Sequence, residues 1–235
     1  MTHPLDGARK RIERANKHLN EIVSLLETDA TEYQNSFIVE HDHVRNQPNV
    51  LIPPPREIPW EIPFAASDCI HNLRVALDYL MFELSRKLSG DPNPTATQFP
   101  LCETLDQFDN HLRAAAKGKG PLRYLPATYI NRIEAYQPYK GVDWAETMRF
   151  LSNQDKHREL MIIRVSRATM ISDGCGEVFK GVGPDRSDVQ MERKTTTQIT
   201  FADQQPVVEA LDVMKRQVSL VIDSFSGEFQ ASFRT

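Results

Sequence analysis

Cysteine is scarce in this 235-residue chain, and its spacing excludes a structural zinc site built from thiolates. Only Cys69, Cys102 and Cys175 occur, and none of them has the close cysteine neighbour that metal-binding motifs require. An odd number of scattered thiols is typical of a reducing compartment. We therefore expect a cytoplasmic protein.

The chain also lacks an apolar run long enough for a membrane span and the apolar region of a signal peptide. We therefore expect neither membrane insertion nor secretion. Its charge is nearly balanced, with 28 Lys and Arg against 32 Asp and Glu, which gives a formal net charge of -4. This balance provides no global attraction to nucleic acid or anionic lipid, so any recognition of phosphate would have to be local.

Common fingerprints of catalysis and nucleotide binding are missing too. The Gly118-Lys119-Gly120 turn has neither the preceding strand nor the following Ser or Thr of a P-loop. No serine lies in a GxSxG elbow, and no dinucleotide fingerprint follows a strand. We expect no cofactor.

What the sequence does contain is a set of amphipathic helices. Apolar residues recur in alternating steps of three and four, which keeps them on one stripe of an α-helix. The stripes predict long helices at residues 5–27, 65–89, 142–156 and 206–225, and shorter ones near 105–116 and 127–136. Because isolated helices are marginal in water, the first, second and last of the long helices should share a core.

Extended segments are predicted between the helices. Residues 36–52 form short strands ahead of a proline-rich stretch, and residues 160–201 show a period of two, interrupted by glycine-rich turns. The predicted fold class is α+β, mostly α: a bundle of long amphipathic helices with an antiparallel β meander. We expect one domain over residues 1–235, with its helical core in 5–27, 65–156 and 206–225.

Two polar blocks stand out against this pattern. On the second long helix, Ser67, His71, Arg74 and Asp78 follow one another at steps of four, three and four, so they form a row beside the leucine stripe. An imidazole, a guanidinium and a carboxylate in one row could carry acid–base chemistry. The same row could equally be a surface feature in which Arg74 and Asp78 form an ordinary ion pair.

The second block lies where the helix at 142–156 ends, and a helix C-terminus favours cations there on structural grounds alone. If the two blocks meet in space, they form a polar pocket. The candidate catalytic residues are then His71, Arg74, Asp78, Asn153, Asp155, Lys156, His157 and Arg158. Arg9, Arg11, Arg14 and Lys17 lie off the apolar stripe of the first helix, and we interpret them as a solvated basic face.

Several strings in the middle of the chain resemble a family of uncharacterised bacterial proteins. They are His71-Asn72-Leu73-Arg74 with Ala76-Leu77-Asp78, Phe99-Pro100, Gln137-Pro138-Tyr139, and Asn153 with Asp155-Lys156-His157-Arg158. The resemblance covers about residues 65–160 and implies a bacterial protein of helical architecture, without an assigned activity.

At greater distance, the paired helices and the polar block resemble the HEPN superfamily of helical domains. The resemblance implies either a metal-independent ribonuclease, which in that superfamily uses an arginine and a histidine a few residues apart, or an inactive interaction module. This sequence departs from the catalytic pattern, because Arg149 precedes His157 by too many positions and Asn153 precedes it by too few.

Our first expectation for the function is a helical interaction or oligomerisation module, acting as a homodimer or with a partner protein. In this hypothesis the polar residues form a structural network in which Asp78 and Asn153 satisfy His and Arg donors.

Two alternatives stay open. The first is cleavage of RNA, with His157 or His71 as acid or base, Asp78 or Asp155 orienting the imidazole, and Arg74, Lys156 and Arg158 stabilising phosphate charge. The second is a metal site formed by His41 and His43, or by Asp68 with His71. Cys69, on the inner side of its helix, is expected to be a buried apolar residue rather than a nucleophile.

Overall fold

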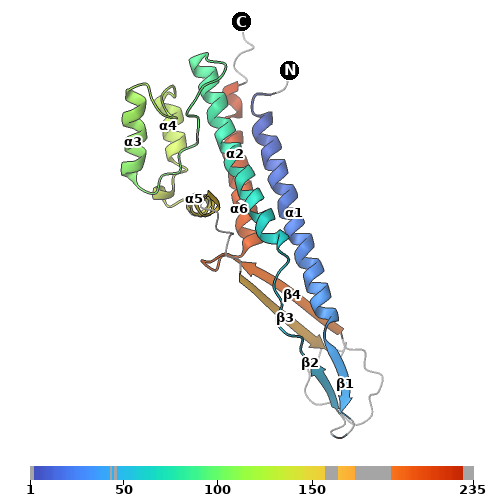
Figure 1. The fold of residues 1–235 in the computed structure, drawn as a ribbon. Helices are drawn as coiled ribbons and strands as arrows, with labels where there is room; N and C mark the ends of the chain where they lie inside the picture. Colours follow the sequence, from blue (N-terminus) through green and yellow to red (C-terminus); the bar gives the residue numbers. More distant parts are fainter. Residues whose placement is uncertain (1–2, 43, 45–46, 157–163, 173–191, 230–235) are drawn as a thin grey trace.

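Three long helices lie side by side along the molecule, and Figure 1 shows two β-hairpins at one end of them. The computed structural model describes residues 3–42, 44, 47–156, 164–172 and 192–229. Helix α1 (Asp6–Asn35) runs antiparallel to α2 (Glu61–Ser89) and α6 (Val207–Ser224). We call the end that carries the hairpins the hairpin end and the opposite end the terminal end, because the N-terminus and the end of α6 lie there.

The predicted stripes of α1, α2 and α6 face one another and form the core. Buried side chains include Ile22 of α1, Leu73 and Leu77 of α2, and Leu211 and Val218 of α6, all fully covered. Burying an aliphatic side chain of this size contributes about 1.5–3 kcal/mol, which exceeds the contribution of any helix cap. The expectation that these three helices share a core is confirmed.

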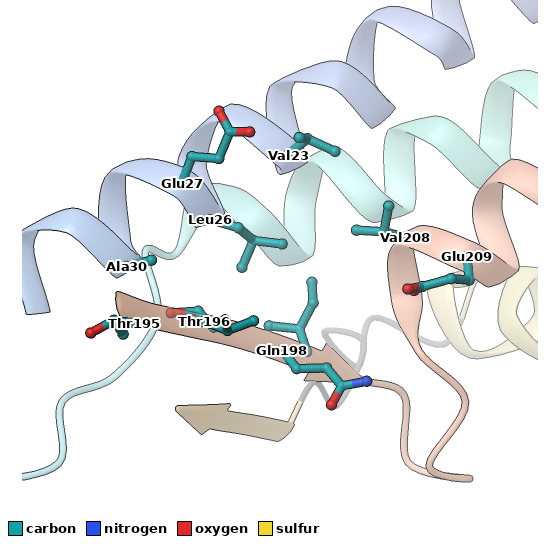
Figure 2. Close-up of a pocket in the computed structure, with 11 residues that line it drawn as sticks. Val23, Leu26, Glu27, Ala30, Thr195, Thr196, Gln198, Val208 and Glu209 are labelled. Atoms are coloured by element: carbon teal, nitrogen blue, oxygen red, sulfur yellow. The ribbon is translucent and has the colours of Figure 1, made fainter. Parts of the chain in front are cut away.

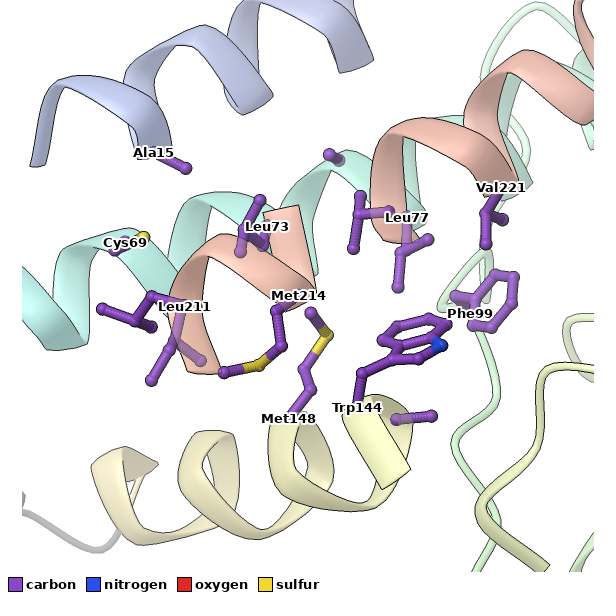
Figure 3. Packing of buried hydrophobic residues seen from close by; sticks show 14 of the residues in the cluster. Ala15, Cys69, Leu73, Leu77, Phe99, Trp144, Met148, Leu211, Met214 and Val221 are labelled. Carbon is purple, nitrogen blue, oxygen red and sulfur yellow. The ribbon is translucent and has the colours of Figure 1, made fainter. Parts of the chain in front are cut away.

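Helix α5 (Asp143–Lys156) crosses this group and closes one side of the core. Figure 3 shows Met148 of α5 against Met214 of α6, with Trp144 one turn earlier and close to Phe99. Helices α3 (Leu105–Ala116) and α4 (Ala127–Glu134) form a separate pair beside α2, and their buried residues Phe108 and Ile133 belong to the same apolar cluster. Two 3-10 turns, η1 (Pro138–Lys140) and η2 (Ser226–Phe229), complete the helical part.

The described strands form two separate antiparallel hairpins. In one, β1 (Ile38–Asp42) pairs with β2 (Gln47–Leu51), and in the other β3 (Arg164–Ser172) pairs with β4 (Glu192–Thr200). The side chains of β4 alternate as the period of two predicts, since Thr195, Thr197 and Ile199 turn towards the helices while Thr196 and Gln198 are exposed. The prediction of an α+β fold that is mostly α is confirmed.

Most predicted helix limits agree with the structure to within two residues. Helix α3 matches its prediction residue for residue, and Thr104 caps it by accepting a hydrogen bond from the amide of Gln107. Helix α2 starts four residues earlier than predicted, because Pro63 lies in its first turn, where a proline is tolerated. Helix α1 continues to Asn35, well beyond the predicted end at residue 27.

The cause of this extension is a buried carboxylate. Asp29 follows Leu26 by three residues, so it continues the apolar stripe of α1, and it is only 1% exposed. Arg167 of β3 donates from Nε to Oδ2 at 2.9 Å and from Nη2 to Oδ1 at 3.0 Å. Arg56 donates from Nη2 to Oδ1 at 3.0 Å, and Thr197 of β4 donates its hydroxyl to Oδ2 at 3.0 Å. We call Asp29, Arg56, Arg167 and Thr197 the Asp29 cluster.

The Asp29 cluster joins three segments that are remote in sequence: α1, the proline-rich segment before α2, and the β3–β4 hairpin. Burial by itself raises the pKa of the Asp29 carboxyl, but hydrogen bonds from Arg167, Thr197 and Arg56 outweigh burial and hold the pKa below its ordinary value. Asp29 is therefore a carboxylate in the folded protein.

Replacing Asp29 by alanine should lower the free energy of unfolding by about 3–5 kcal/mol, because two guanidinium groups lose their buried counter-charge. Urea denaturation followed by circular dichroism measures this loss. Glu32 also contacts Arg56, at 3.1 Å, but its side chain is 62% exposed. Glu32→Ala is therefore the matched control and should cost less than about 1 kcal/mol. Equal losses in the two variants would contradict the role given to Asp29.

The pH dependence of stability should carry the signature of Asp29. Because its pKa is lower in the folded state, the contribution of Asp29 is present above the unfolded pKa of about 3.9 and is lost as the pH falls through the folded value. The gap between the unfolding free energies of wild type and Asp29→Asn should therefore stay constant from about pH 7 to about pH 5 and close as the pH falls from about 4 to about 2. A constant gap over the lower of these two ranges would show that Asp29 is not the titrating group.

Candidate functional site

Two members of the predicted polar row, Arg74 and Asp78, hold the backbone of a loop residue. Asp78 Oδ1 accepts a hydrogen bond from the amide of Phe99 at 2.8 Å, and Arg74 Nη2 donates to the carbonyl of the same residue. Arg74 Nη2 and Asp78 Oδ1 lie 3.6 Å apart. Both polar backbone atoms of Phe99 are thus satisfied by one ion pair on α2.

Gln137 does the same for the residues that follow Phe99. Its side chain is fully buried, its Oε1 accepts from the amide of Cys102 at 2.9 Å, and its Nε2 donates to the carbonyl of Pro100 at 2.9 Å. The Phe99–Cys102 segment has no regular secondary structure of its own. Buried backbone groups need partners, and these side chains provide them.

The side chain of Phe99 explains why this segment has to be fixed. Phe99 is fully buried, and Figure 3 shows it between Trp144 and Val221. The segment also connects α2 to the α3–α4 pair, so its position sets where that pair lies. Three of the four strings on which the family resemblance was based, His71–Asp78, Phe99-Pro100 and Gln137–Tyr139, therefore share a structural role here through Arg74, Asp78 and Gln137.

The other candidate residues are placed as follows. His71 is exposed on α2, about one turn before Arg74, and Asn153 is exposed near the end of α5. Asp155 and Lys156 are in the last turn of α5, but the positions of their side chains are not described. His157 and Arg158 lie outside the described residues. A pocket formed by both polar blocks therefore stays a prediction.

Electrostatics at Arg74 support a structural role. Burial lowers the pKa of its guanidinium, and the nearby carboxylate of Asp78 partly opposes this effect. Arg74 Nη1 is buried and has no hydrogen-bond partner within the described part of the chain. An arginine that is largely buried and donates from one amino group to a backbone carbonyl is poorly placed to bind a substrate phosphate.

The metal and thiol expectations have different outcomes. Among the described residues, no group of three or more His, Cys, Asp and Glu side chains could hold a metal ion, and Asp68 and His71 are both exposed. His43 and the side chain of His41 are outside the description. Cys69 is fully buried, and burial raises the pKa of its thiol to about 12, which confirms that it is an apolar core residue.

A feature that the sequence analysis missed is a groove between α1 and α6 on the side away from α2. Two hollows lie in line along this seam. The one near the hairpin end has a volume of about 290 Å³ and is bounded by α1, β4 and the start of α6, as Figure 2 shows. The one nearer the terminal end has a volume of about 690 Å³ and is bounded by α1 and α6 alone.

Both hollows are lined by apolar, polar and charged side chains together. Val23, Leu26, Ala30 and Val208 line the smaller hollow, with Glu27 and Glu209 at its edge. The larger hollow is lined by Ile12, Glu13, Asn16, Lys17, Lys215, Arg216, Ser219 and Leu220. Leu220, in the lining of the larger hollow, is 58% exposed. We call these two hollows together the α1–α6 groove.

The basic face predicted for α1 is only partly solvated, which corrects the sequence interpretation. Arg9 donates to Ser226 at 2.8 Å and lies 3.5 Å from Asp223, closing the terminal end of the groove. Arg11 donates to Asn72 at 3.3 Å and lies over the ring of Tyr79. Arg14 and Lys17 are exposed, as expected. Four cations at helical spacing do not reveal which of them have partners on other helices.

Comparison with models of protein families, with curated proteins and with solved structures finds no match to this chain. Within the described residues, no helix has both the length and the apolar character needed to cross a membrane. Function must therefore be argued from the geometry of the molecule itself.

Substitution of Asp78 separates a structural from a catalytic role. Asp78→Ala should lower the free energy of unfolding by about 1–3 kcal/mol, because the Phe99 amide and Arg74 lose their partner. Asp78→Asn keeps an acceptor for the amide of Phe99, so its free energy of unfolding should fall by less than that of Asp78→Ala. Asp68→Ala, at an exposed carboxylate of the same helix, is the control and should change stability by no more than about 0.5 kcal/mol. A fully stable Asp78→Ala protein would refute the structural assignment.

Proposed function

We propose that this chain is a helical interaction module that binds an amphipathic helix of another chain in the α1–α6 groove. The observation that supports this proposal most directly is the alignment of two hollows, each with apolar residues in its lining, along one seam between α1 and α6. The proposal concerns binding, because Arg74 and Asp78 of the candidate catalytic row are occupied with the backbone of Phe99.

The groove has the dimensions of a helix-binding surface. Its lining residues on α1 extend from Ile12 to Ala30, which corresponds to about 27 Å at 1.5 Å per residue. Helices α1 and α6 pack beside each other with α2 behind them, so a helix laid in the groove would occupy the fourth position of a bundle. Such a helix needs apolar side chains at a three-four spacing to fill the hollows.

The distribution of exposed apolar residues agrees with this function. Leu220 stands at the larger hollow, and Val213 is 40% exposed two turns earlier on α6. Protein interfaces typically combine exposed apolar side chains with a polar rim. The charged rim of Glu27, Glu209, Lys17 and Arg216 gives the groove the polar border that such interfaces have.

Lysine acetylation provides a test at a defined position. Lys17 lines the groove, whereas Lys10 on the same helix and Lys119 on the α3–α4 loop do not, and all three are exposed. With an acetylating reagent and mass spectrometry, the modification rate of Lys17 should fall several-fold when the groove is filled. The full chain is compared in dilute buffer, at high concentration and in an extract of its host cells.

Lys10 and Lys119 should keep constant rates under the three conditions, which makes them internal controls. If Lys17 reacts at the same rate in all three conditions, the groove binds no helix and the proposed function is wrong. If all three lysines slow together, the effect is a general one and also contradicts a docking site at the groove.

A further inference from the structure

We infer that the α1–α6 groove is covered by α1 and α6 of a second copy of this chain, packed antiparallel across a two-fold axis. This inference rests on the proposed function and names the partner. In such a dimer the same face of each copy meets the other, so every contact occurs twice and the face must complement itself. The order of charges along the groove meets this condition.

Apart from Glu13, which also lines the larger hollow, charges are separated along the groove in the same direction on both helices. Glu27 of α1 and Glu209 of α6 stand near the hairpin end, and Lys17 of α1 and Arg216 of α6 stand closer to the terminal end. Glu27, Glu209 and Lys17 form no ion pair among the residues that the structure describes. Arg216 pairs with Asp212 at 3.0 Å, with its own side chain 64% exposed.

A two-fold axis across the middle of the groove would bring opposite charges together. The contacts of Arg9 with Asp223 and of Lys215 with Asn16 fix which residues of α1 and α6 lie level with each other. Each helix has a midpoint between its two charges, Lys17 and Glu27 on α1, and Arg216 and Glu209 on α6. In this register the two midpoints lie within about one helical turn of each other along the helix axis. A two-fold rotation about an axis that crosses the groove at that level places the cations of one copy over the carboxylates of the other.

The helix dipole of α1 points to the same arrangement. Lys17 lies in its N-terminal half and Glu27 in its C-terminal half, although the dipole favours the opposite order. Asp29 and Glu32 are explained by their contacts with Arg56, but Lys17 and Glu27 form no ion pair in the part of the chain that the structure describes. An antiparallel second copy would supply opposite charges and an opposed dipole.

The shape of the α1–α6 groove is self-complementary as well. Leu220 protrudes level with Ile12 on the terminal side of the midpoint, and the smaller hollow lined by Leu26 and Ala30 lies on the hairpin side. They lie about 13 Å and about 11 Å from the midpoint along the helix axis. The two-fold rotation therefore carries Leu220 of one copy to the mouth of the smaller hollow of the other, where an apolar side chain would be covered.

Sedimentation equilibrium of the full chain over a range of concentrations tests the inference. The wild type should be a dimer in equilibrium with monomer. Lys17→Glu and Glu27→Lys should each weaken dimerisation by about tenfold, since each reversal places two pairs of like charges across the interface. The double variant restores opposite charges with exchanged positions, so its Kd should return to within about threefold of the wild-type value.

Two further variants complete the experiment. Arg14→Glu changes the same charge on the same helix but outside the groove, and its Kd should equal that of the wild type. Leu220→Asp should be monomeric with an unchanged circular dichroism spectrum, and Leu105→Asp, at a leucine that is 52% exposed on α3, should remain dimeric.

The outcomes separate this inference from the proposed function. A monomeric wild type at all concentrations overturns the inference, and so does a double variant that is no tighter than the single ones. If the pure chain is monomeric while Lys17 is still protected in extract, the groove binds a different chain and only the inference fails. If Lys17 is protected in neither case, the proposed function fails with it.

Discussion

The architecture at the hairpin end depends on one carboxylate, Asp29, placed where the stripe of α1 would otherwise carry an aliphatic residue. A two-stranded hairpin is marginally stable by itself in water. The β3–β4 hairpin is held because Arg167 and Thr197 bind Asp29, and because the amide of Thr195 donates to Gln34 of α1 at 3.1 Å. Arg56 brings the proline-rich segment to the same carboxylate, so one charge fixes three chain segments.

A second set of polar side chains fixes the opposite flank by a different means. Arg74, Asp78 and Gln137 bind the backbone of the Phe99–Cys102 segment and so position the α3–α4 pair. The pair is also tied to η2, the turn that follows α6, where Tyr129 and Arg132 bind Glu228. The Arg74–Asp78 pair and Gln137 use charged or amide groups to bind the backbone of a loop whose polar atoms have no partner in a sheet or helix. This explains polar residues beside an apolar stripe without invoking a substrate.

Periodicity was sufficient to predict the helices, because the three-four spacing reports directly which face is buried. Periodicity failed at Asp29, because a carboxylate continues the apolar stripe there. The predicted end of α1 therefore came too early. The polar row on α2 was found, but its role was not, since the partner of Arg74 and Asp78 is a backbone group 21 residues beyond Asp78. The groove was missed because Leu220 lies off the core stripe and each helix was read alone. The available signal in the sequence was Leu220, a leucine that lies among charged residues on a face of α6 other than its core stripe.

The Asp29 cluster also determines the shape of the proposed interface. One wall of the smaller hollow is β4, and Thr197, which binds Asp29, lies in that wall between the exposed Thr196 and Gln198. The opposite wall is the stretch of α1 from Val23 to Ala30, which carries Asp29 itself on its inner side. The hollow therefore exists in the isolated chain and need not be formed on binding. A surface that is already ordered loses less conformational entropy on association, so the buried ion cluster favours binding at the groove as well as folding of the hairpin.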